Sequence, residues 1–174
     1  MFLRKNQIGI SAVCFGHNLI EEGFSFGHSV DILCSLNINE FRGNKTVQLI
    51  VRDIDYSEKI LLELKDQEKR FLQLRDGIGF FSEQDIPKRE DFALLYKWIR
   101  EENYQQEKSL TLLKLKSVFT SFSYLKLLIM LETFRECELI TWKQISTAKY
   151  RICRLETKEK KNLYAAPIMR TLLQ

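Results

Sequence analysis

The chain has 174 residues, of which 45% are hydrophobic and 11% aromatic. This composition can bury one good core or two small ones, and it excludes a disordered chain because so much aromatic surface would be costly to leave in water. With 27 Lys and Arg residues against 23 Asp and Glu residues, the net charge is +4, which is compatible with a nucleic-acid partner where the positive charge is clustered.

The first third of the sequence alternates apolar and polar residues, with the period of two that is typical of strands. This alternation predicts strands over residues 7–15, 29–38 and 45–53. In the last of them Val47, Leu49 and Val51 share one face and are expected to lie in a core. Gly43 and Asn44 tolerate a positive φ angle, which predicts a hairpin turn between the last two strands.

After residue 54 the apolar residues have the spacing of a helix. Asp55 and Glu58 have the spacing of a capping box, and the helix that they predict is expected to fray or break before Gly77. Glycines and a proline make residues 76–87 the best domain boundary. The remaining pattern predicts three helices, the last capped by Ser123, and then two short strands. These elements cover residues 87–103, 107–122, 123–138, 139–147 and 149–156.

Signals for export, membrane insertion or a metal centre are weak. The N-terminus has no apolar signal-peptide core, and no window approaches the ~18 apolar residues that span a bilayer, so we expect a cytoplasmic protein with no membrane partner. The cysteines are widely spaced and are expected to be free, mostly buried thiols rather than disulfides or zinc ligands. They are Cys14, Cys34, Cys137 and Cys153.

No catalytic motif is present. The sequence lacks a phosphate-binding loop, a dinucleotide fingerprint, a nucleophile elbow and a metalloprotease helix, so we predict no catalytic residue, no metal ligand and no cofactor in this chain. Asp53 and Asp55 suggest a metal-binding couple, but a strand end and a helix cap explain them better. His17 and His28 are interpreted as surface or turn residues rather than as a catalytic base and its partner.

The predicted hairpin turn has the composition of a nucleic-acid contact. Oligonucleotide-binding β-barrels combine aromatic rings for base stacking with Arg and Lys for phosphates. The structural alternative is that Phe41 packs over the end of the barrel while Arg42 pairs with Glu40 or Asp53. The residues suited to nucleic-acid contact are Asn39, Phe41, Arg42, Asn44 and Lys45.

The segments "ISAVCFG" and "GHSVDILCSLNINEFRGNKTVQLIVRDI" resemble the closing part of the OB-fold domain of bacterial RecJ, the single-stranded-DNA-specific exonuclease. The segments "FLQLRD", "PKREDFALLYKWIRE", "LETFRECELI" and "NLYAAPIMRTLL" resemble the extra C-terminal region of some RecJ proteins. The DHH phosphoesterase core of that family, with its Asp and His ligands for Mn²⁺ or Mg²⁺, lies upstream of this region, and nothing in this sequence matches it. Met1 is therefore interpreted as the start of a truncated or remnant reading frame, or of an engineered fragment.

The resemblance implies an α+β fold. A partial OB-like antiparallel β unit, residues 1–55, precedes a helix and linker, residues 56–86. For residues 87–174 the order of three helices and a small β-hairpin itself predicts a winged-helix-like C-terminal domain.

The resemblance also implies a function. The whole enzyme would hydrolyse single-stranded DNA processively from 5′ to 3′ in recombination and repair, and this part would grip the strand without cutting it. By this resemblance Asn39, Phe41, Arg42 and Asn44 lie at the rim of a DNA channel, and Lys45 or Arg52 assists phosphate contact. The implied partners are single-stranded DNA, the catalytic part of the exonuclease and single-strand-binding protein.

Two other functions stay open. A protein-interaction module is the alternative suggested by the helix at 123–138, whose apolar residues exceed what one buried face requires, although burial on several sides explains them as well. A non-functional remnant of a RecJ reading frame is the other alternative. An independent enzyme ranks below both.

Overall fold

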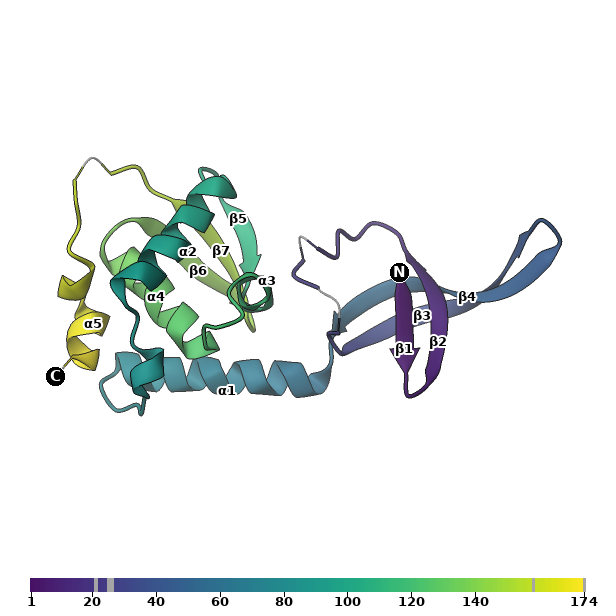
Figure 1. The fold of residues 1–174 in the computed structure, drawn as a ribbon, viewed down its shortest axis with the longest axis horizontal. Helices are drawn as coiled ribbons and strands as arrows, with labels where there is room; N and C mark the ends of the chain where they lie inside the picture. The colour runs from purple at the N-terminus through teal and green to yellow at the C-terminus, as the bar shows by residue number, and fades with distance from the viewer. Residues whose placement is uncertain (21, 25–26, 158, 174) are drawn as a thin grey trace.

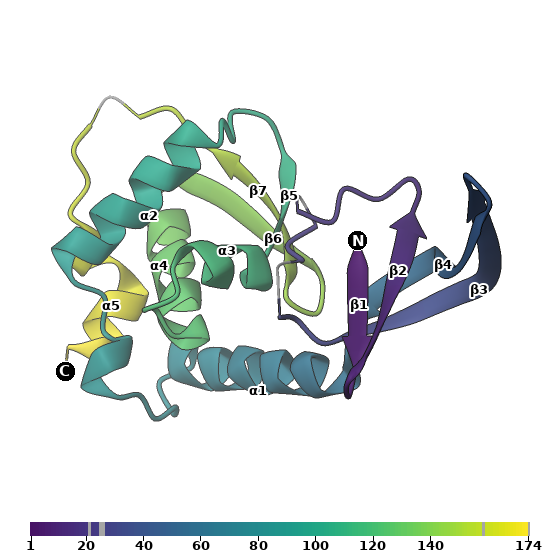
Figure 2. The ribbon, with the colours of Figure 1, turned by 45° about the vertical axis from the view of Figure 1, so that its right-hand side comes forward.

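The computed structural model describes residues 1–20, 22–24, 27–157 and 159–173. It contains a four-stranded sheet, a long helix, and a second unit in which helices cover one face of a three-stranded sheet (Figure 1). The fold is therefore a mixture of α and β elements, with the second unit packed along the long helix and the first sheet at the N-terminal end of that helix (Figures 1 and 2). Among the described residues, no helix is both long enough and apolar enough to cross a membrane.

The first sheet is mixed, which corrects the prediction of an antiparallel unit. Its strands are β1 (Phe2–Lys5), β2 (Ile8–Cys14), β3 (Val30–Phe41) and β4 (Asn44–Tyr56), in the order β1-β2-β4-β3. The β1/β2 and β3/β4 pairs are antiparallel, whereas β2 and β4 run parallel. The parallel pairing joins β2 and β4, which are not consecutive in the chain. The alternation of apolar and polar residues within a strand carries no information about which strand lies beside it.

Strands β3 and β4 form a long hairpin that projects beyond the other two strands (Figures 1 and 2). Its turn consists of Arg42 and Gly43, with φ angles of 51° and 78°, while Asn44 pairs with Phe41 as the first residue of β4. The predicted turn at Gly43 and Asn44 was thus displaced by one residue. A two-residue turn with both φ angles positive matches the right-handed twist of the strands, and this favours the observed position.

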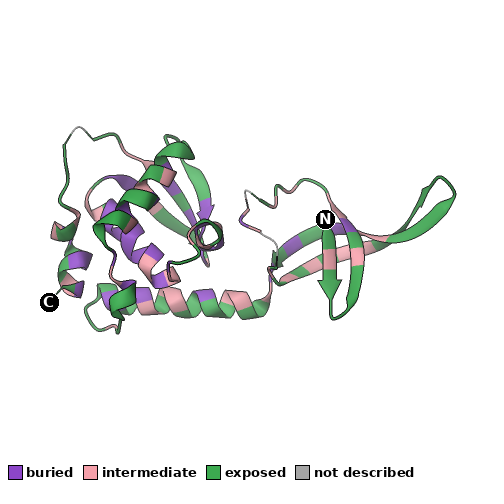
Figure 3. Cartoon of the chain, viewed as in Figure 1, coloured by how far each residue is buried: buried purple, intermediate pink, exposed green. Residues whose placement is uncertain are grey.

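The core of the first sheet is small. Its fully buried apolar residues are Ala12, Val51 and Ile54. Val47, predicted to lie in a core, is 55% exposed, because none of the described elements forms a second layer over the distal half of the β3–β4 hairpin (Figure 3). Cys14 and Cys34 are free and only half-buried, as are Cys137 and Cys153, so the expectation of mostly buried thiols was wrong.

Helix α1 (Glu58–Arg75) joins the two units. Its N-cap is Ser57 rather than the predicted Asp55, because β4 continues to Tyr56 and leaves Asp55 in the strand. There the Asp55 carboxylate accepts a hydrogen bond from the backbone N–H of Tyr56 at 2.7 Å. Leu64, Phe71 and Leu74 are buried, so one face of α1 belongs to the larger core.

The second unit contains α2 (Arg89–Glu101), β5 (Lys108–Thr111), α3 (Leu112–Val118), α4 (Tyr124–Glu136), β6 (Ile140–Ser146), β7 (Lys149–Arg154) and α5 (Pro167–Leu172). Short 3-10 helices, η1 (Glu83–Asp85) and η2 (Leu163–Ala165), precede α2 and α5. The three strands are ordered β5-β7-β6 and are antiparallel.

The helix predicted over residues 107–122 was wrong in its first turn. Lys108–Thr111 instead form β5, which pairs with β7. The Thr111 hydroxyl then accepts a hydrogen bond from the backbone N–H of Lys114 at 3.0 Å and caps α3. The apolar residues of this segment fit the period of a helix and also that of a strand. The pairing with β7, which is distant in the sequence, selects the strand.

Helix α4 is enclosed by the other elements of the second unit. Ser123 caps it as predicted and accepts a hydrogen bond from the Lys126 backbone N–H at 3.0 Å. The apolar excess that suggested an interaction surface is buried on several sides. Its fully buried apolar residues are Leu125, Leu127, Leu128, Ile129, Met130, Leu131 and Phe134.

Glu68 of α1 attaches the β6–β7 hairpin to the long helix. Its carboxylate accepts hydrogen bonds from Gln144 Nε2 at 2.9 Å, the Ala148 backbone N–H at 2.7 Å and the Tyr150 hydroxyl at 2.5 Å. The Glu68 carboxylate therefore accepts from hydrogen-bond donors in the β6–β7 hairpin and from the hydroxyl of a buried tyrosine. These bonds fix the orientation of α1 on the second unit.

Asp85 fastens the linker after α1 to the start of α4. Its carboxylate accepts hydrogen bonds from the Ser123 hydroxyl at 2.6 Å and from the hydroxyl and backbone N–H of Ser82 at 2.8 and 3.0 Å. Burial alone would raise the pKa of Asp85, but these hydrogen bonds to the charged form outweigh burial and lower it.

We expect Asp85→Asn to reduce the free energy of unfolding at pH 7 by about 1–3 kcal/mol, because an amide cannot accept all of these hydrogen bonds. Since the folded-state pKa is lowered, the contribution of Asp85 is present above its ordinary pKa and is lost as the pH falls through the folded-state value. Denaturant unfolding of both proteins between pH 7 and pH 3 measures this. A constant difference over that range would contradict the assignment.

Candidate nucleic-acid interface

The tip of the β3–β4 hairpin presents an aromatic ring and a guanidinium together. Phe41 is 65% exposed, and the Arg42 guanidinium carbon lies 5.2 Å from the centroid of its ring. The alternative in which Phe41 packs over the end of a barrel is therefore wrong. A flat, exposed pair of this kind suits stacking on a base with a phosphate nearby.

Arg42 occupies an unusual backbone conformation. Its φ angle of 51° lies in the left-handed region, which costs a residue with a Cβ roughly 1–2 kcal/mol and which Gly or Asn would adopt more readily. Strained residues of this type concentrate at functional sites. An arginine at this exposed turn position is therefore a candidate for a functional side chain.

Strand register divides the predicted residues between two faces of the hairpin. Asn39 lies opposite Thr46, and Phe41 opposite Asn44, so these residues share one face. Lys45 lies opposite Glu40 on the other face and forms an ion pair with it at 3.6 Å, both side chains being exposed. Glu40, one of the two partners that the structural alternative gave to Arg42, thus pairs with Lys45.

Sequence reasoning missed two amides on the face of Phe41. Asn37 and Gln48 are opposite each other and share the face of Phe41. The face therefore continues from the ring at the tip through a row of polar side chains along both strands. Alternation counted along the strands from Phe41 and Asn44 would have identified these amides.

Arg52 does not join the tip. It lies at the irregularity in the β3–β4 register, where Leu33 pairs with Asp53 and Cys34 with Val51. At about 3.4 Å per residue it is about 27 Å along β4 from Asn44. The structure brings Asn39, Phe41, Arg42, Asn44 and Lys45 together and leaves Arg52 apart.

The other polar candidates have local structural partners. His17 Nδ1 lies 3.2 Å from both carboxylate oxygens of Glu22, and the His28 ring meets Tyr56 edge-on at 6.0 Å. Asp53 accepts a hydrogen bond from the backbone N–H of Ile54 at 2.9 Å. Within the described ranges, no group of three or more His, Cys, Asp or Glu side chains could hold a metal ion.

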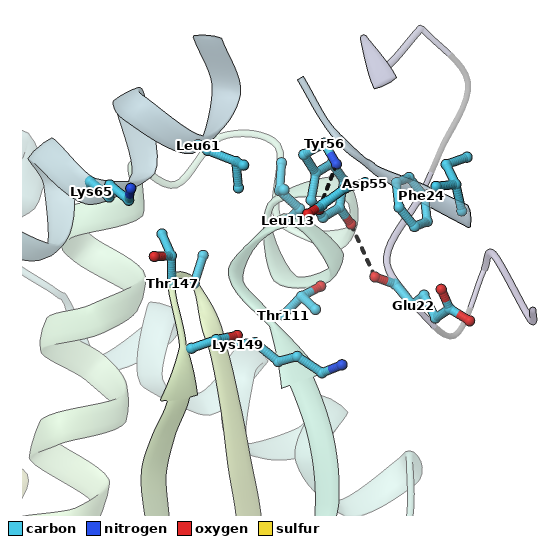
Figure 4. A pocket seen from close by; sticks show the side chains of 13 residues that line it. Glu22, Phe24, Asp55, Tyr56, Leu61, Lys65, Thr111, Leu113, Thr147 and Lys149 are labelled. Atoms are coloured by element: carbon cyan, nitrogen blue, oxygen red, sulfur yellow. Dashed lines mark hydrogen bonds between the residues drawn. The ribbon is translucent and has the colours of Figure 1, made fainter. Parts of the chain in front are cut away.

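An open pocket of about 400 Å³ lies where the first sheet meets the second unit (Figure 4). The Tyr56 hydroxyl donates a hydrogen bond to the Glu22 carbonyl at 3.0 Å, and Phe24 stacks on the Tyr56 ring at 4.4 Å. A Cβ at Gly23 would collide with the Thr111 hydroxyl. This tight contact fixes the base of the hairpin on the second unit, and burial raises the pKa of Tyr56 to about 12, so its hydroxyl stays protonated.

Residues 1–53 match the family model described as the RecJ OB domain. The match includes β1, β2, β3 and most of β4, and therefore the whole hairpin tip. It covers 53 of the 174 residues and does not extend to α1 or the second unit. No curated protein and no solved structure shows significant similarity to the chain. Most of the first sheet is thus similar to a RecJ OB domain.

Proposed function

We propose that this chain is the single-stranded-nucleic-acid-binding accessory part of a RecJ-type 5′-to-3′ exonuclease of DNA recombination and repair, and that it does not cut DNA by itself. The observation that carries the proposal is the exposed pair of Phe41 and Arg42 at the tip of a RecJ-type OB region. OB folds commonly bind single strands by stacking bases on aromatic rings and placing cations near the phosphates.

In the proposed complex, one base stacks on Phe41 while Arg42 neutralises an adjacent phosphate. Asn39 and Asn44 lie on the face of Phe41 and hydrogen-bond to base edges or sugars. Lys45 assists from the opposite face, where Glu40 offsets part of its charge. Arg52 contacts the nucleic acid only where the bound single strand is long enough to follow β4 toward the base of the hairpin.

For the second unit we propose a winged-helix-like scaffold. The order α2-β5-α3-α4-β6-β7 and the sheet order β5-β7-β6 support this fold. In helix-turn-helix domains the second helix reads the major groove, but α4 is buried along most of its length. The second unit therefore holds α1 and the hairpin in place, and the buried apolar surface of α4 gives no support to the protein-interaction alternative.

Mn²⁺ or Mg²⁺ would serve the catalytic part of the exonuclease, while this chain would contribute strand binding. We propose single-stranded DNA and that catalytic part as partners, with single-strand-binding protein as a further one, and the cytoplasm as the location.

The proposal predicts that Arg42→Asn weakens binding of labelled single-stranded DNA and reduces the slope of log K against log salt by about 1. Asparagine favours the same left-handed turn, so the substitution removes the charge and keeps the hairpin. Fluorescence anisotropy across a salt series measures both quantities.

Lys97→Gln is the matched control, because Lys97 is an exposed cation of α2, distant from the hairpin, and its loss changes net charge equally. Equal losses of affinity and slope in both variants would mean that net charge, and not the tip, governs binding. No binding of the wild-type chain at low salt would reject an autonomous DNA-binding role.

A further inference from the structure

The three-stranded sheet of the second unit has one covered face and one open face. Tyr150 and Ile152 of β7 are buried, so the residues that alternate with them point away from the core. Directly opposed residues of neighbouring strands share a face, and the register extends the open face across β5 and β6. Its exposed residues form the basic sheet face, which consists of Ser109, Thr141, Lys143, Lys149 and Arg151.

The cations of the basic sheet face have few acidic partners. The strand sequences KSLT, ITWKQIS and KYRICR contain no Asp or Glu. Among the described residues, no acid forms an ion pair with Lys143 or Lys149. Arg151 lies 3.8 Å from Glu107, with both side chains more than half exposed, and an exposed pair of this kind is weak. The face is therefore a patch of positive charge.

Strand register sets two of these cations against each other. Lys143 lies directly opposite Arg151, and the Cβ atoms of such a pair are about 5 Å apart. Like charges in directly opposed positions destabilise a sheet. Features that lower stability are typical of functional surfaces, where a bound partner offsets the cost. The arrangement therefore favours an anionic partner over this face.

We propose that the basic sheet face binds the phosphate backbone of a nucleic-acid strand, an inference that rests on the proposed binding of single-stranded DNA. Lys149 and Arg151 are two residues apart on β7, or about 7 Å, which is similar to the spacing of neighbouring phosphates along an extended strand. The hydroxyls of Ser109 and Thr141 donate hydrogen bonds to phosphate oxygens. The face has no aromatic residue, so the contact does not depend on the bases.

An acidic protein fits the basic sheet face less well than a nucleic-acid backbone does. Protein interfaces depend on buried aromatic or apolar anchors, whereas this face consists of cations and hydroxyls. Phosphate contacts need only cations and hydrogen-bond donors at a suitable spacing. The composition of the face therefore selects the nucleic acid.

The positive charge continues from the sheet toward the base of the β3–β4 hairpin. Lys149 lines the pocket where the first sheet meets the second unit, together with Lys65 of α1 (Figure 4). The two acids of this pocket, Glu22 and Asp55, have local partners. One long strand can therefore contact the hairpin and the basic sheet face, and gain avidity from both.

Lys143→Glu separates this inference from a structural role, because it is expected to change stability and binding in opposite directions. The introduced carboxylate attracts Arg151 across the strands, so the melting temperature at low salt should rise. The affinity for single-stranded DNA should fall roughly tenfold or more, because a negative charge then faces the phosphates. Thermal unfolding and fluorescence anisotropy measure the two effects.

Lys97→Glu is the matched control, because it makes the same change of net charge on an exposed site of α2. It also breaks the ion pair between Lys97 and Glu101. Its melting temperature should therefore fall slightly, and its affinity for DNA should change much less than that of Lys143→Glu.

A strand without bases distinguishes the basic sheet face from the hairpin tip. Oligothymidylate and an abasic deoxyribose-phosphate strand of the same length carry the same phosphates, but only the first has bases that stack on Phe41. Phe41→Ala is expected to weaken binding of oligothymidylate alone, whereas Lys143→Glu is expected to weaken binding of both strands.

Unchanged affinity of Lys143→Glu for both strands would overturn the inference and leave the hairpin tip as the binding site. A loss in Lys143→Glu without any loss in Phe41→Ala would keep the basic sheet face and reject the tip. A lower melting temperature for Lys143→Glu would assign Lys143 a structural role instead. Polyglutamate that competes as well as the abasic strand would indicate an acidic protein partner, and a wild-type chain that binds neither strand would reject both sites.

Discussion

Phe134→Ala is expected to lower the free energy of unfolding of the second unit by about 3–5 kcal/mol, the cost of emptying a large aromatic site in a core. Phe134 is 1% exposed, and its ring contacts Phe92 and Tyr96 at centroid distances of 5.6 and 5.4 Å. Because α4 is enclosed, the surroundings have little freedom to collapse into the cavity. Equilibrium denaturation in urea measures the change.

Phe80→Ala is the control for this experiment. Phe80 is 92% exposed in the linker after α1, so its removal is expected to change stability by less than about 0.5 kcal/mol. A loss below about 1 kcal/mol for Phe134→Ala would contradict the burial of α4. Such a result would reopen the possibility that α4 reads nucleic acid directly.

Phe41→Ala is expected to weaken binding of single-stranded DNA by about 1–3 kcal/mol, or about 5- to 150-fold, because one stacked base loses its platform. Stability should change little, since the ring is 65% exposed. Anisotropy titration with a short labelled oligonucleotide at low salt measures the affinity.

The same Phe80→Ala variant serves as the control for Phe41→Ala, since it removes an exposed phenylalanine far from the hairpin. Its affinity for the oligonucleotide should equal that of the wild type. An unchanged affinity for Phe41→Ala would remove the ring from the interface, and an equal loss in both variants would indicate general hydrophobic adhesion.

Local patterns in the sequence predicted much of the fold. Alternation identified β2, β3 and β4, and the Ser123 cap marked the start of α4. Features of the fold that depend on contacts with segments distant in the sequence were not predicted. The parallel β2–β4 pairing and the strand at Lys108–Thr111 both depend on segments far away in the chain, and the exposure of Val47 depends on a layer that does not cover the hairpin.

The candidate site was predictable to a similar degree. The composition of the turn identified Phe41 and Arg42, and the structure leaves the Phe41 ring exposed with the guanidinium beside it. The division into two faces follows from the alternation of side chains along the paired strands. Lys45 was grouped with Phe41 by the composition of the turn alone, and Asn37 and Gln48, which lie outside the turn, were overlooked.

Photo-cross-linking with mass spectrometry shows whether the hairpin tip holds the DNA strand. Oligothymidylate irradiated with the full chain is expected to attach to peptides from residues 39–45, and an excess of unlabelled single-stranded DNA should abolish this attachment. Phe41→Ala should lose it as well. Cross-links confined to the second unit, with residues 39–45 unmodified, would mean that the DNA strand is held elsewhere.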